Sequence, residues 1–153
     1  MRAAPTFARV MLCVASLGAA GLPGVAGARQ APSPGEAVQP AADELAAAPR
    51  ISVDELRALR DRVRGVLVVD VRSSAVGATI DGAASVPLAR LAEWGADTPR
   101  DAQIVCYCAC RAESLSAAAV LRLRSLGFTN ARALRGGLQA WIERGLPVAP
   151  AAG

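Results

Sequence analysis

Aliphatic runs alternate with segments of helical periodicity between residues 50 and 149. The runs at residues 66–71 and 103–107 are nearly continuous, which predicts strands that are apolar on both faces, as in the middle of a covered parallel sheet. Shorter apolar stretches at residues 83–87 and 131–134 predict two further strands. Because helical segments separate these strands, the order indicates an α/β fold with a parallel sheet.

The helices have recognisable start and stop signals. A capping box occupies residues 52–55, with Ser first and Glu three positions later, so a helix is expected to begin there. In residues 114–127, Ser114 is expected to cap a long helix and Gly127 to end it in the left-handed conformation. Further helical turns are expected at residues 88–94 and 138–145.

Residues 1–28 differ in composition from the rest of the chain. They begin with Arg2 and Arg9, continue through an apolar stretch, and finish with Ala26 and Ala28 in a small-x-small pattern, which is typical of a secretory signal peptide. The competing interpretation, a retained membrane anchor, requires about 20 apolar residues, and this run has about 13 to 15. We therefore expect a bacterial protein that is periplasmic or secreted and is not inserted in the membrane after cleavage.

The segment 29–49 is rich in Ala and Pro and predicts a flexible linker, although its last part, 41–48, could form a short helix. The domain itself is expected to cover residues 50–149. Residues 150–153 are then a short tail.

Composition excludes several classes of function. All 17 basic residues are arginine, against 13 acidic residues, and they are scattered rather than clustered, so nucleic-acid binding is not expected. The chain contains no histidine, which excludes Ser-His-Asp and Cys-His catalytic arrangements and every metal site that uses imidazole. Any nucleophile has to be activated in another way.

Three cysteines follow one another at alternate positions in "CYCAC", at the end of the strand predicted for residues 103–107. Cys106 lies inside that strand and is expected to be a core residue. Cys108 lies just beyond it, where free backbone N–H groups of the loop and of the next helix would converge on its sulfur. Such a setting favours a thiolate and lowers the thiol pKa below its free value of about 8.5, with Arg111 adding positive charge.

Other roles for these thiols remain open at this point. Cys110 is close enough in sequence to react with Cys108, but a disulfide across two residues is strained. A zinc site without histidine usually needs four thiolates, so three cysteines would need Glu113 or an outside ligand. We expect neither a metal nor a cofactor.

The order of segments resembles a single rhodanese domain, a family of sulfurtransferases. The resemblance covers about residues 50–148 and rests on "VLVVDVR", "IDGAASVPL", "IVCYC" and "LGFTNARALRGGLQAWIERGLPV". It implies a five-stranded parallel sheet flanked by helices on both faces. It also implies that Cys108 is the nucleophile, which takes a sulfane sulfur from thiosulfate or a persulfide and passes it to cyanide or to the thiol of a small molecule or protein.

The resemblance assigns the remaining site residues. The substrate loop is expected to consist of Ala109, Cys110, Arg111, Ala112, Glu113 and Ser114. Asp70 and Arg72 match an Asp-x-Arg pair of the family, and a supporting role in fixing the loops is favoured for them. Glu113 stands where the family often has arginine, which weakens the case for the dianion thiosulfate unless Arg111 turns inward. A Cys-x-Cys loop with this glutamate is similar to a bacterial variant of the domain.

Two other functions are compatible with the sequence. The thiols could exchange disulfides with a partner, in a redox or binding module for which sulfur transfer is incidental. Related folds also use a cysteine, five further residues and an arginine to bind phosphate, but position 114 is serine here, which disfavours a phosphatase.

Overall fold

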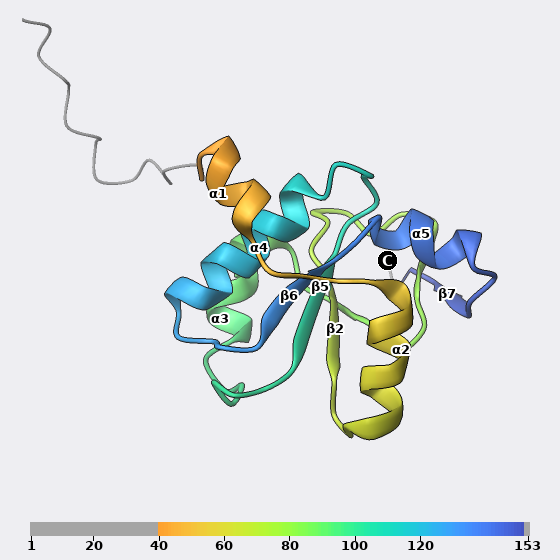
Figure 1. Ribbon diagram of the computed structural model, residues 1–153, viewed down its shortest axis with the longest axis horizontal. Helices are drawn as coiled ribbons and strands as arrows, with labels where there is room; N and C mark the ends of the chain where they lie inside the picture. The colour runs from red at the N-terminus through yellow and green to blue at the C-terminus, as the bar shows by residue number, and fades with distance from the viewer. Residues whose placement is uncertain (1–39, 152–153) are drawn as a thin grey trace, which may run out of the picture. The chain divides into compact units, whose positions relative to one another are not determined.

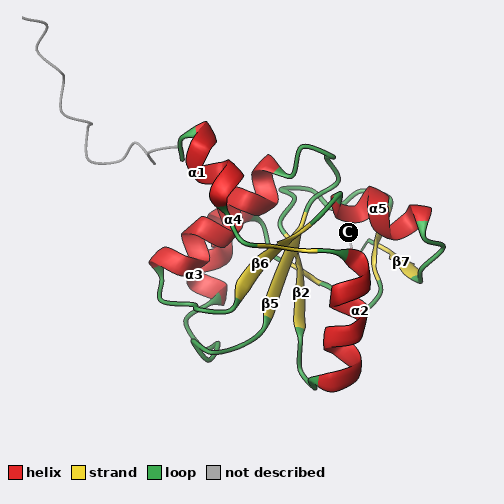
Figure 2. Cartoon of the chain, in the orientation of Figure 1, coloured by secondary structure: helices red, strands yellow, loops and turns green. Residues whose placement is uncertain are grey.

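Five parallel strands form the central sheet, in the order β1-β6-β5-β2-β4. Their bounds are Arg50–Ile51 for β1, Leu67–Asp70 for β2, Ala84–Ser85 for β4, Ile104–Tyr107 for β5 and Ala131–Leu134 for β6. The structure, a computed structural model, describes residues 40–151, so the predicted leader and most of the predicted linker lie outside the described residues. Figure 2 shows the strands surrounded by helices. The predicted parallel α/β fold is confirmed.

Helices cover both faces of the sheet. They are α2 (Val53–Arg62), the short α3 (Leu91–Trp94) after a 3-10 turn at Leu88–Arg90, α4 (Ser114–Ser125) and α5 (Gly137–Glu143). Figure 1 shows α3 and α4 on one side and α2 and α5 on the other. The five-stranded sheet flanked by helices on both faces agrees with the resemblance.

Alternation along the central strands divides the core into two layers. Val69, Cys106 and Cys108 face α3 and α4, whereas Val105 and Tyr107 face α2 and α5. Successive side chains of a strand point to opposite faces, and here both faces are covered, which is why these strands read as continuous apolar runs. Cys106 and Cys108 therefore lie on the same face, as their spacing predicts.

The ends of the helices follow the sequence signals with one exception. Ser52 caps α2 by accepting a hydrogen bond from the backbone N–H of Glu55, and Gly127 ends α4 with φ of 92°. The expectation that Ser114 caps α4 is wrong, because the capping position is Glu113, which has a left-handed φ of 56° and no capping side-chain bond.

Part of the segment expected to be a linker is ordered beside the domain. Residues Ala42–Ala47 form helix α1, which lies beside α4 (Figure 1). The Arg50 guanidinium holds the end of α1 by donating to the carbonyl oxygens of Leu45, Ala46 and Ala48 at 3.0, 2.7 and 2.9 Å. The described part of the chain thus includes a helix before the sheet.

A second, two-stranded sheet was not anticipated. In it, β3 (Ala78–Ile80) pairs antiparallel with β7 (Val148–Pro150), so the chain after α5 returns to the loop that follows β2. Both strands are three residues long, too short to give a periodic signal. Within residues 40–151, no helix has the length and apolar character that crossing a membrane requires.

Candidate functional site

The loop between β5 and α4 lies at the carboxyl end of the central strand. Its first residue, Cys108, is 1% exposed, whereas Cys110 is exposed to solvent. Cys106, in β5 itself, is 0% exposed, which confirms its prediction as a core residue. In open parallel sheets ligands bind beyond the carboxyl ends of the strands, so the loop stands where this fold places its chemistry.

The sulfurs of Cys108 and Cys110 lie 3.0 Å apart. The Cys108 thiol also approaches the backbone oxygen of Cys110 at 3.7 Å and the hydroxyl oxygen of Ser116 at 3.9 Å. Ser116 is completely buried and donates its own hydroxyl proton to the carbonyl oxygen of Glu113 at 3.0 Å. Cys108 is thus buried against polar atoms, and its closest sulfur neighbour is a second thiol.

The pKa values of the two thiols are shifted in opposite directions. Burial raises the pKa of Cys108, and its hydrogen bond to Cys110 raises it further, although backbone N–H groups of Ser116 and Cys110 oppose both effects. Partial burial alone would raise the pKa of Cys110 as well. Hydrogen bonds from the Cys108 thiol, from two backbone N–H groups and from the Ser114 hydroxyl outweigh it and lower that pKa.

The expectation that the pKa of Cys108 is lowered is therefore wrong, because the lowered pKa belongs to Cys110. Backbone N–H groups of Glu113 and Leu115 help to lower the pKa of Cys110, so the first thiolate of the pair is favoured there. When two thiols are this close, the first proton lost belongs to the pair, and the second is harder to remove. Backbone N–H groups thus favour a thiolate without any histidine, but they favour it on Cys110 of the pair rather than on Cys108.

Cys106 takes no part in this network. Burial raises its pKa from an ordinary 9.0 to about 12, so it stays a neutral thiol at physiological pH. It packs among the apolar side chains between the sheet and α4. Its role is to fill the core.

Glu113 fixes the far end of the loop. One oxygen of its carboxylate accepts a hydrogen bond from Arg50 Nε at 2.8 Å, and the other accepts one from the backbone N–H of Gly136 at 2.6 Å. The side chains of Glu113 and Arg50 are 13% and 20% exposed, so the ion pair is largely shielded from water. Among the described residues, Glu113 is the only one other than glycine with a left-handed φ.

Arg111 does not turn toward the thiols. Its guanidinium pairs with the carboxylate of Glu143 on α5, and both side chains are exposed. The expectation that Arg111 adds positive charge at the cysteines is therefore wrong: the loop residue that replaces the family's arginine is an acid, and the nearby arginine faces outward.

The Gly136–Gly137 pair lets α5 approach the loop closely. A Cβ atom on Gly137 would lie 2.3 Å from the carbonyl oxygen of Cys108, a distance at which the backbone has to move. The same oxygen accepts a hydrogen bond from the backbone N–H of Leu138 at 2.9 Å. The start of α5 thus holds the backbone of Cys108 in place.

Asp70 and Arg72 act together at the end of β2. The buried Asp70 carboxylate accepts hydrogen bonds from the backbone N–H, Nε and Nη2 of Arg72, the shortest at 2.5 Å. These bonds raise the pKa of Arg72. Arg72 also donates to the carbonyl oxygens of Val76 and Ala78, so the pair fixes the loop between β2 and β3. This arrangement supports a structural role.

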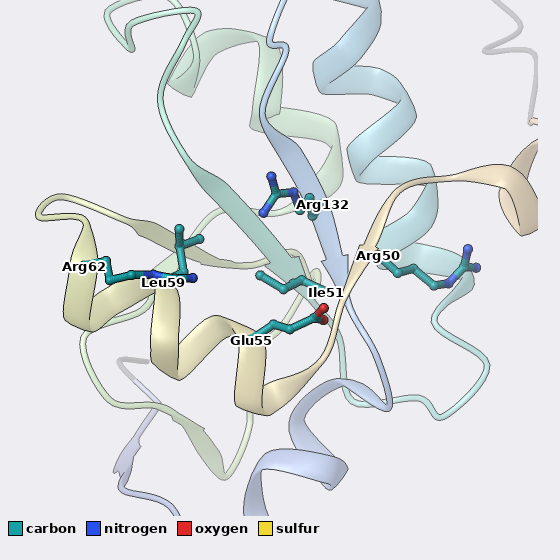
Figure 3. Close-up of a pocket in the computed structure, with 6 residues that line it drawn as sticks. All are labelled: Arg50, Ile51, Glu55, Leu59, Arg62 and Arg132. Atoms are coloured by element: carbon teal, nitrogen blue, oxygen red, sulfur yellow. The ribbon is translucent and has the colours of Figure 1, made fainter.

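A pocket on the surface lies away from the thiols. Figure 3 shows it beside β1 and α2, lined by Arg50, Ile51, Glu55, Leu59, Arg62 and Arg132. The side chain of Arg50 extends away from the other five, in keeping with its bonds to Glu113 and to α1. None of the three cysteines lines this pocket.

Sequence reasoning missed several residues that shape the site. Arg50 looked like one of many surface arginines, and Ser116 like an ordinary residue of α4, because their partners are distant in sequence. The Gly-Gly pair was noticed as a motif, and the close approach at Gly137 explains it. Ala109 and Ala112 are exposed loop residues whose contacts with a substrate stay a prediction. Within residues 40–151, no three Cys, Asp or Glu side chains come together as a metal site would require.

Comparison with known proteins identifies the family. Residues 52–144 match the model of the rhodanese-like domain family. A human thiosulfate:glutathione sulfurtransferase is 34% identical over 116 residues, which cover 65% of this chain and 98% of the human protein. A sulfurtransferase of Allochromatium vinosum is 35% identical over 85 residues, covering 54% of this chain and 78% of that protein.

Solved structures agree in fold. The solution structure of a rhodanese-like domain from Anabaena superposes with a TM-score of 0.59 at 27% identity, covering 67% of this chain and 80% of that domain. The family model spans more than half of the chain, and its matched region contains the cysteine loop, the Asp70–Arg72 pair and the Gly-Gly turn. The chain therefore belongs to the rhodanese-like domain family.

Proposed function

We propose that this chain is an exported sulfurtransferase that moves a sulfane sulfur through a persulfide on Cys108. The donor is thiosulfate or a persulfide, and the acceptor is cyanide or the thiol of a small molecule or protein. The observation that carries the proposal is the position of Cys108 at the end of β5, with its sulfur 3.0 Å from Cys110 and close to backbone N–H groups of the loop. The sulfurtransferase relatives support the same class of reaction.

Cys110 provides the base that the missing histidine would otherwise supply. As the Cys108 sulfur attacks the outer sulfur of the donor, the Cys110 thiolate accepts the Cys108 proton across the 3.0 Å contact. With thiosulfate, the S–S bond of the donor breaks and sulfite leaves with the bonding electrons. Cys108 then holds the transferred sulfur as a persulfide anion.

The burial of Cys108 sets how a donor enters. Cys108 is only 1% exposed, and the sulfur of the exposed Cys110 lies 3.0 Å from its own. Rotation of the Cys110 side chain uncovers the Cys108 sulfur. A compact anion or the end of a persulfide fits such an opening better than a bulky substrate does.

In the second step, the acceptor removes the outer sulfur from Cys108. Cyanide or a thiolate attacks the outer sulfur of the persulfide, and the Cys108 sulfur leaves as a thiolate. Backbone N–H groups of Cys110 and Ser116 stabilise that leaving thiolate, as they do before the reaction. Because the inward arginine of the family loop is absent, we expect weaker binding of dianionic thiosulfate than of a persulfide donor.

The test is production of thiocyanate from thiosulfate and cyanide by the purified chain. Cys108→Ala should abolish it, because no sulfur remains to accept the sulfane sulfur. Cys106→Ala is the matched control, since it removes a thiol from the core only, and it should keep the activity if it stays folded. Activity that survives in Cys108→Ala would exclude the assignment of the persulfide to Cys108.

The close pair of thiols also favours a second candidate, a thiol/disulfide exchange module without sulfur transfer. Mass spectrometry of the loop after thiosulfate treatment separates the two. A gain of one sulfur supports transfer, whereas a loss of two hydrogens with no sulfur intermediate at any time, and no sulfide or thiocyanate formed, supports exchange.

Export rests on the pattern of residues 1–28, which lies outside the described residues. Expression in a bacterium, followed by sequencing of the protein recovered from the periplasm, should find an N-terminus near Arg29. Retention in the membrane fraction with the leader intact would favour the anchor interpretation. Recovery from the cytoplasm alone would contradict export.

A further inference from the structure

Besides the sulfur that Cys108 carries, the site contains a second nucleophile within reach of the first. The Cys110 sulfur lies 3.0 Å from that of Cys108, and a disulfide bond is about 2.05 Å long, so closing the pair requires a movement of roughly 1 Å. The Cys110 side chain is exposed to solvent. Cys106, the only other thiol among residues 40–151, is sealed in the core.

From this geometry we infer that the domain also releases sulfide: Cys110 attacks the inner sulfur of the Cys108 persulfide and displaces hydrosulfide. This inference rests on the proposed function, because it needs the persulfide. The new bond joins the two sulfurs of Cys108 and Cys110, and the bond between the Cys108 sulfur and the outer sulfur breaks. The outer sulfur takes the proton that Cys110 accepted from Cys108 during loading, is reduced and leaves as hydrosulfide, while the two cysteines are oxidised to a disulfide.

The charges around the loop favour release of the outer sulfur as hydrosulfide over a long-lived persulfide. The acid Glu113 occupies the position of the family's arginine, and Arg111 is paired with Glu143 on the surface. Within the described residues, apart from the Cys108 thiol itself, only backbone N–H groups and the hydroxyl group of Ser114 lower the pKa values of these thiols. A persulfide anion is therefore held less firmly than it would be beside a guanidinium.

The attacking sulfur is also prepared for its role. Hydrogen bonds from the N–H groups of Glu113 and Leu115 and from the Ser114 hydroxyl lower the pKa of Cys110, so it gives up the proton received from Cys108 readily, and the outer sulfur of the persulfide accepts that proton. Once Cys108 has given up its proton and accepted sulfur, the same two side chains remain in contact. The cycle is completed when two equivalents of an external thiol reduce the disulfide and are themselves oxidised to a disulfide.

The experiment follows sulfur in a single turnover. The purified chain, reduced and freed of reductant, is mixed with excess thiosulfate, quenched in acid at intervals and digested with trypsin. Cleavage at Arg100 and Arg111 places Cys106, Cys108 and Cys110 on one peptide, residues 101–111. The mass of that peptide and the sulfide in solution are measured for the original chain, Cys110→Ser and the control Cys106→Ala, with circular dichroism to check folding.

We expect the original chain and Cys106→Ala to release about one sulfide per site without added thiol, as the peptide loses two hydrogens. Cys110→Ser should load more slowly, keep the added sulfur, and release sulfide only when a thiol is supplied. A persulfide that persists in the original chain without sulfide release would overturn this inference and leave sulfur transfer intact. If no variant ever gains sulfur or forms thiocyanate, the proposed function itself fails. If only Cys106→Ala loses sulfide release, the attacking thiol is Cys106 rather than Cys110, and the inference is wrong.

Discussion

The Glu113 carboxylate accepts a hydrogen bond from Arg50 Nε at 2.8 Å, and this bond joins the active-site loop to the first strand of the sheet. Arg50 also binds three carbonyl oxygens at the end of α1, so one guanidinium connects the segment before the domain with the loop that carries the thiols. The glutamate that departs from the family pattern is thus a positioning residue. Its carboxylate bonds both Arg50 and the backbone N–H of Gly136.

Removing this bond should loosen the loop. Glu113→Gln keeps an acceptor for the backbone N–H of Gly136 and loses the charge that pairs with Arg50, whereas Glu113→Ala loses both. We expect thiocyanate production to fall in the order original, Gln, Ala, and the Ala variant to lose about 1–3 kcal/mol of unfolding free energy. Steady-state kinetics and denaturant unfolding measure the two effects.

Two further variants sharpen that prediction. Glu143→Gln breaks the exposed pair with Arg111 and should change neither quantity measurably. Glu113→Arg introduces the residue that the family often has, but it would place a positive charge against Arg50, so activity should fall. A rise in thiosulfate activity with unchanged stability in Glu113→Arg would show that Glu113 does not position the loop through Arg50.

Gly137 should be essential because of what it approaches, not only because of its conformation. In Gly137→Ala the new Cβ would lie 2.3 Å from the Cys108 carbonyl oxygen, so the backbone of the nucleophile has to shift. Gly145→Ala is a matched control, since Gly145 also has a positive φ but has no atom within 4 Å of the added Cβ. Gly145→Ala should cost about 1–2 kcal/mol and keep the activity.

Gly137→Ala should cost more stability than its control and lose most of the activity of the folded protein. Thermal unfolding and thiocyanate kinetics on the two variants, side by side, test this. Equal behaviour of the two would mean that the approach of α5 to Cys108 is unimportant.

The ion pair at the end of β2 should matter for stability. Arg72→Ala leaves the Asp70 carboxylate buried without its partner, and breaking such a pair typically costs about 3–5 kcal/mol. Asp70→Asn combined with Arg72→Leu removes both charges and should recover part of the loss. Denaturant unfolding measures both, and Arg90→Ala, which breaks the exposed pair with Glu93, should have no measurable effect. An Arg72→Ala variant as stable as that control would contradict the structural role.

The core thiol should make the protein less stable at alkaline pH. Burial raises the pKa of Cys106 from 9.0 to about 12, so between these values the unfolded chain loses a proton that the folded chain keeps. The stabilisation from Cys106 is present below pH 9.0 and falls by about 1.4 kcal/mol per pH unit as the pH rises toward 12. Cys106→Ala should therefore show a shallower fall of unfolding free energy over this range, and identical slopes would contradict the burial.

Local patterns were enough to predict much of this fold. The strands β2, β5 and β6 and the helices α2, α4 and α5 have apolar runs or caps within their own sequence, and the resemblance supplied the strand number. The strands β1, β3 and β7 are two or three residues long and form only because the chain around them brings partners together. Their pairing is a tertiary effect that no window of sequence contains.

The position of the cysteine loop was predicted from the sequence, but the directions of the pKa shifts of its thiols were not. The alternation of cysteines after β5 located the loop and assigned Cys106 to the core. The loop contains a left-handed turn at Glu113, and the side chain of Glu113 is bound by Arg50, which is 63 residues away in the chain. Sequence spacing therefore could not show that Cys110, rather than Cys108, has the lowered pKa.

The most direct test of this account is a titration of thiolate absorbance in the ultraviolet. We predict that the reduced chain carries one thiolate whose apparent pKa lies below that of an ordinary free thiol, and that Cys110→Ser loses this low transition. The remaining cysteines of the folded domain should ionise only well above that value. If no thiolate appears until the ordinary range, or if Cys110→Ser titrates like the original chain, the paired thiols do not generate the nucleophile, and the chemistry proposed for this loop is wrong.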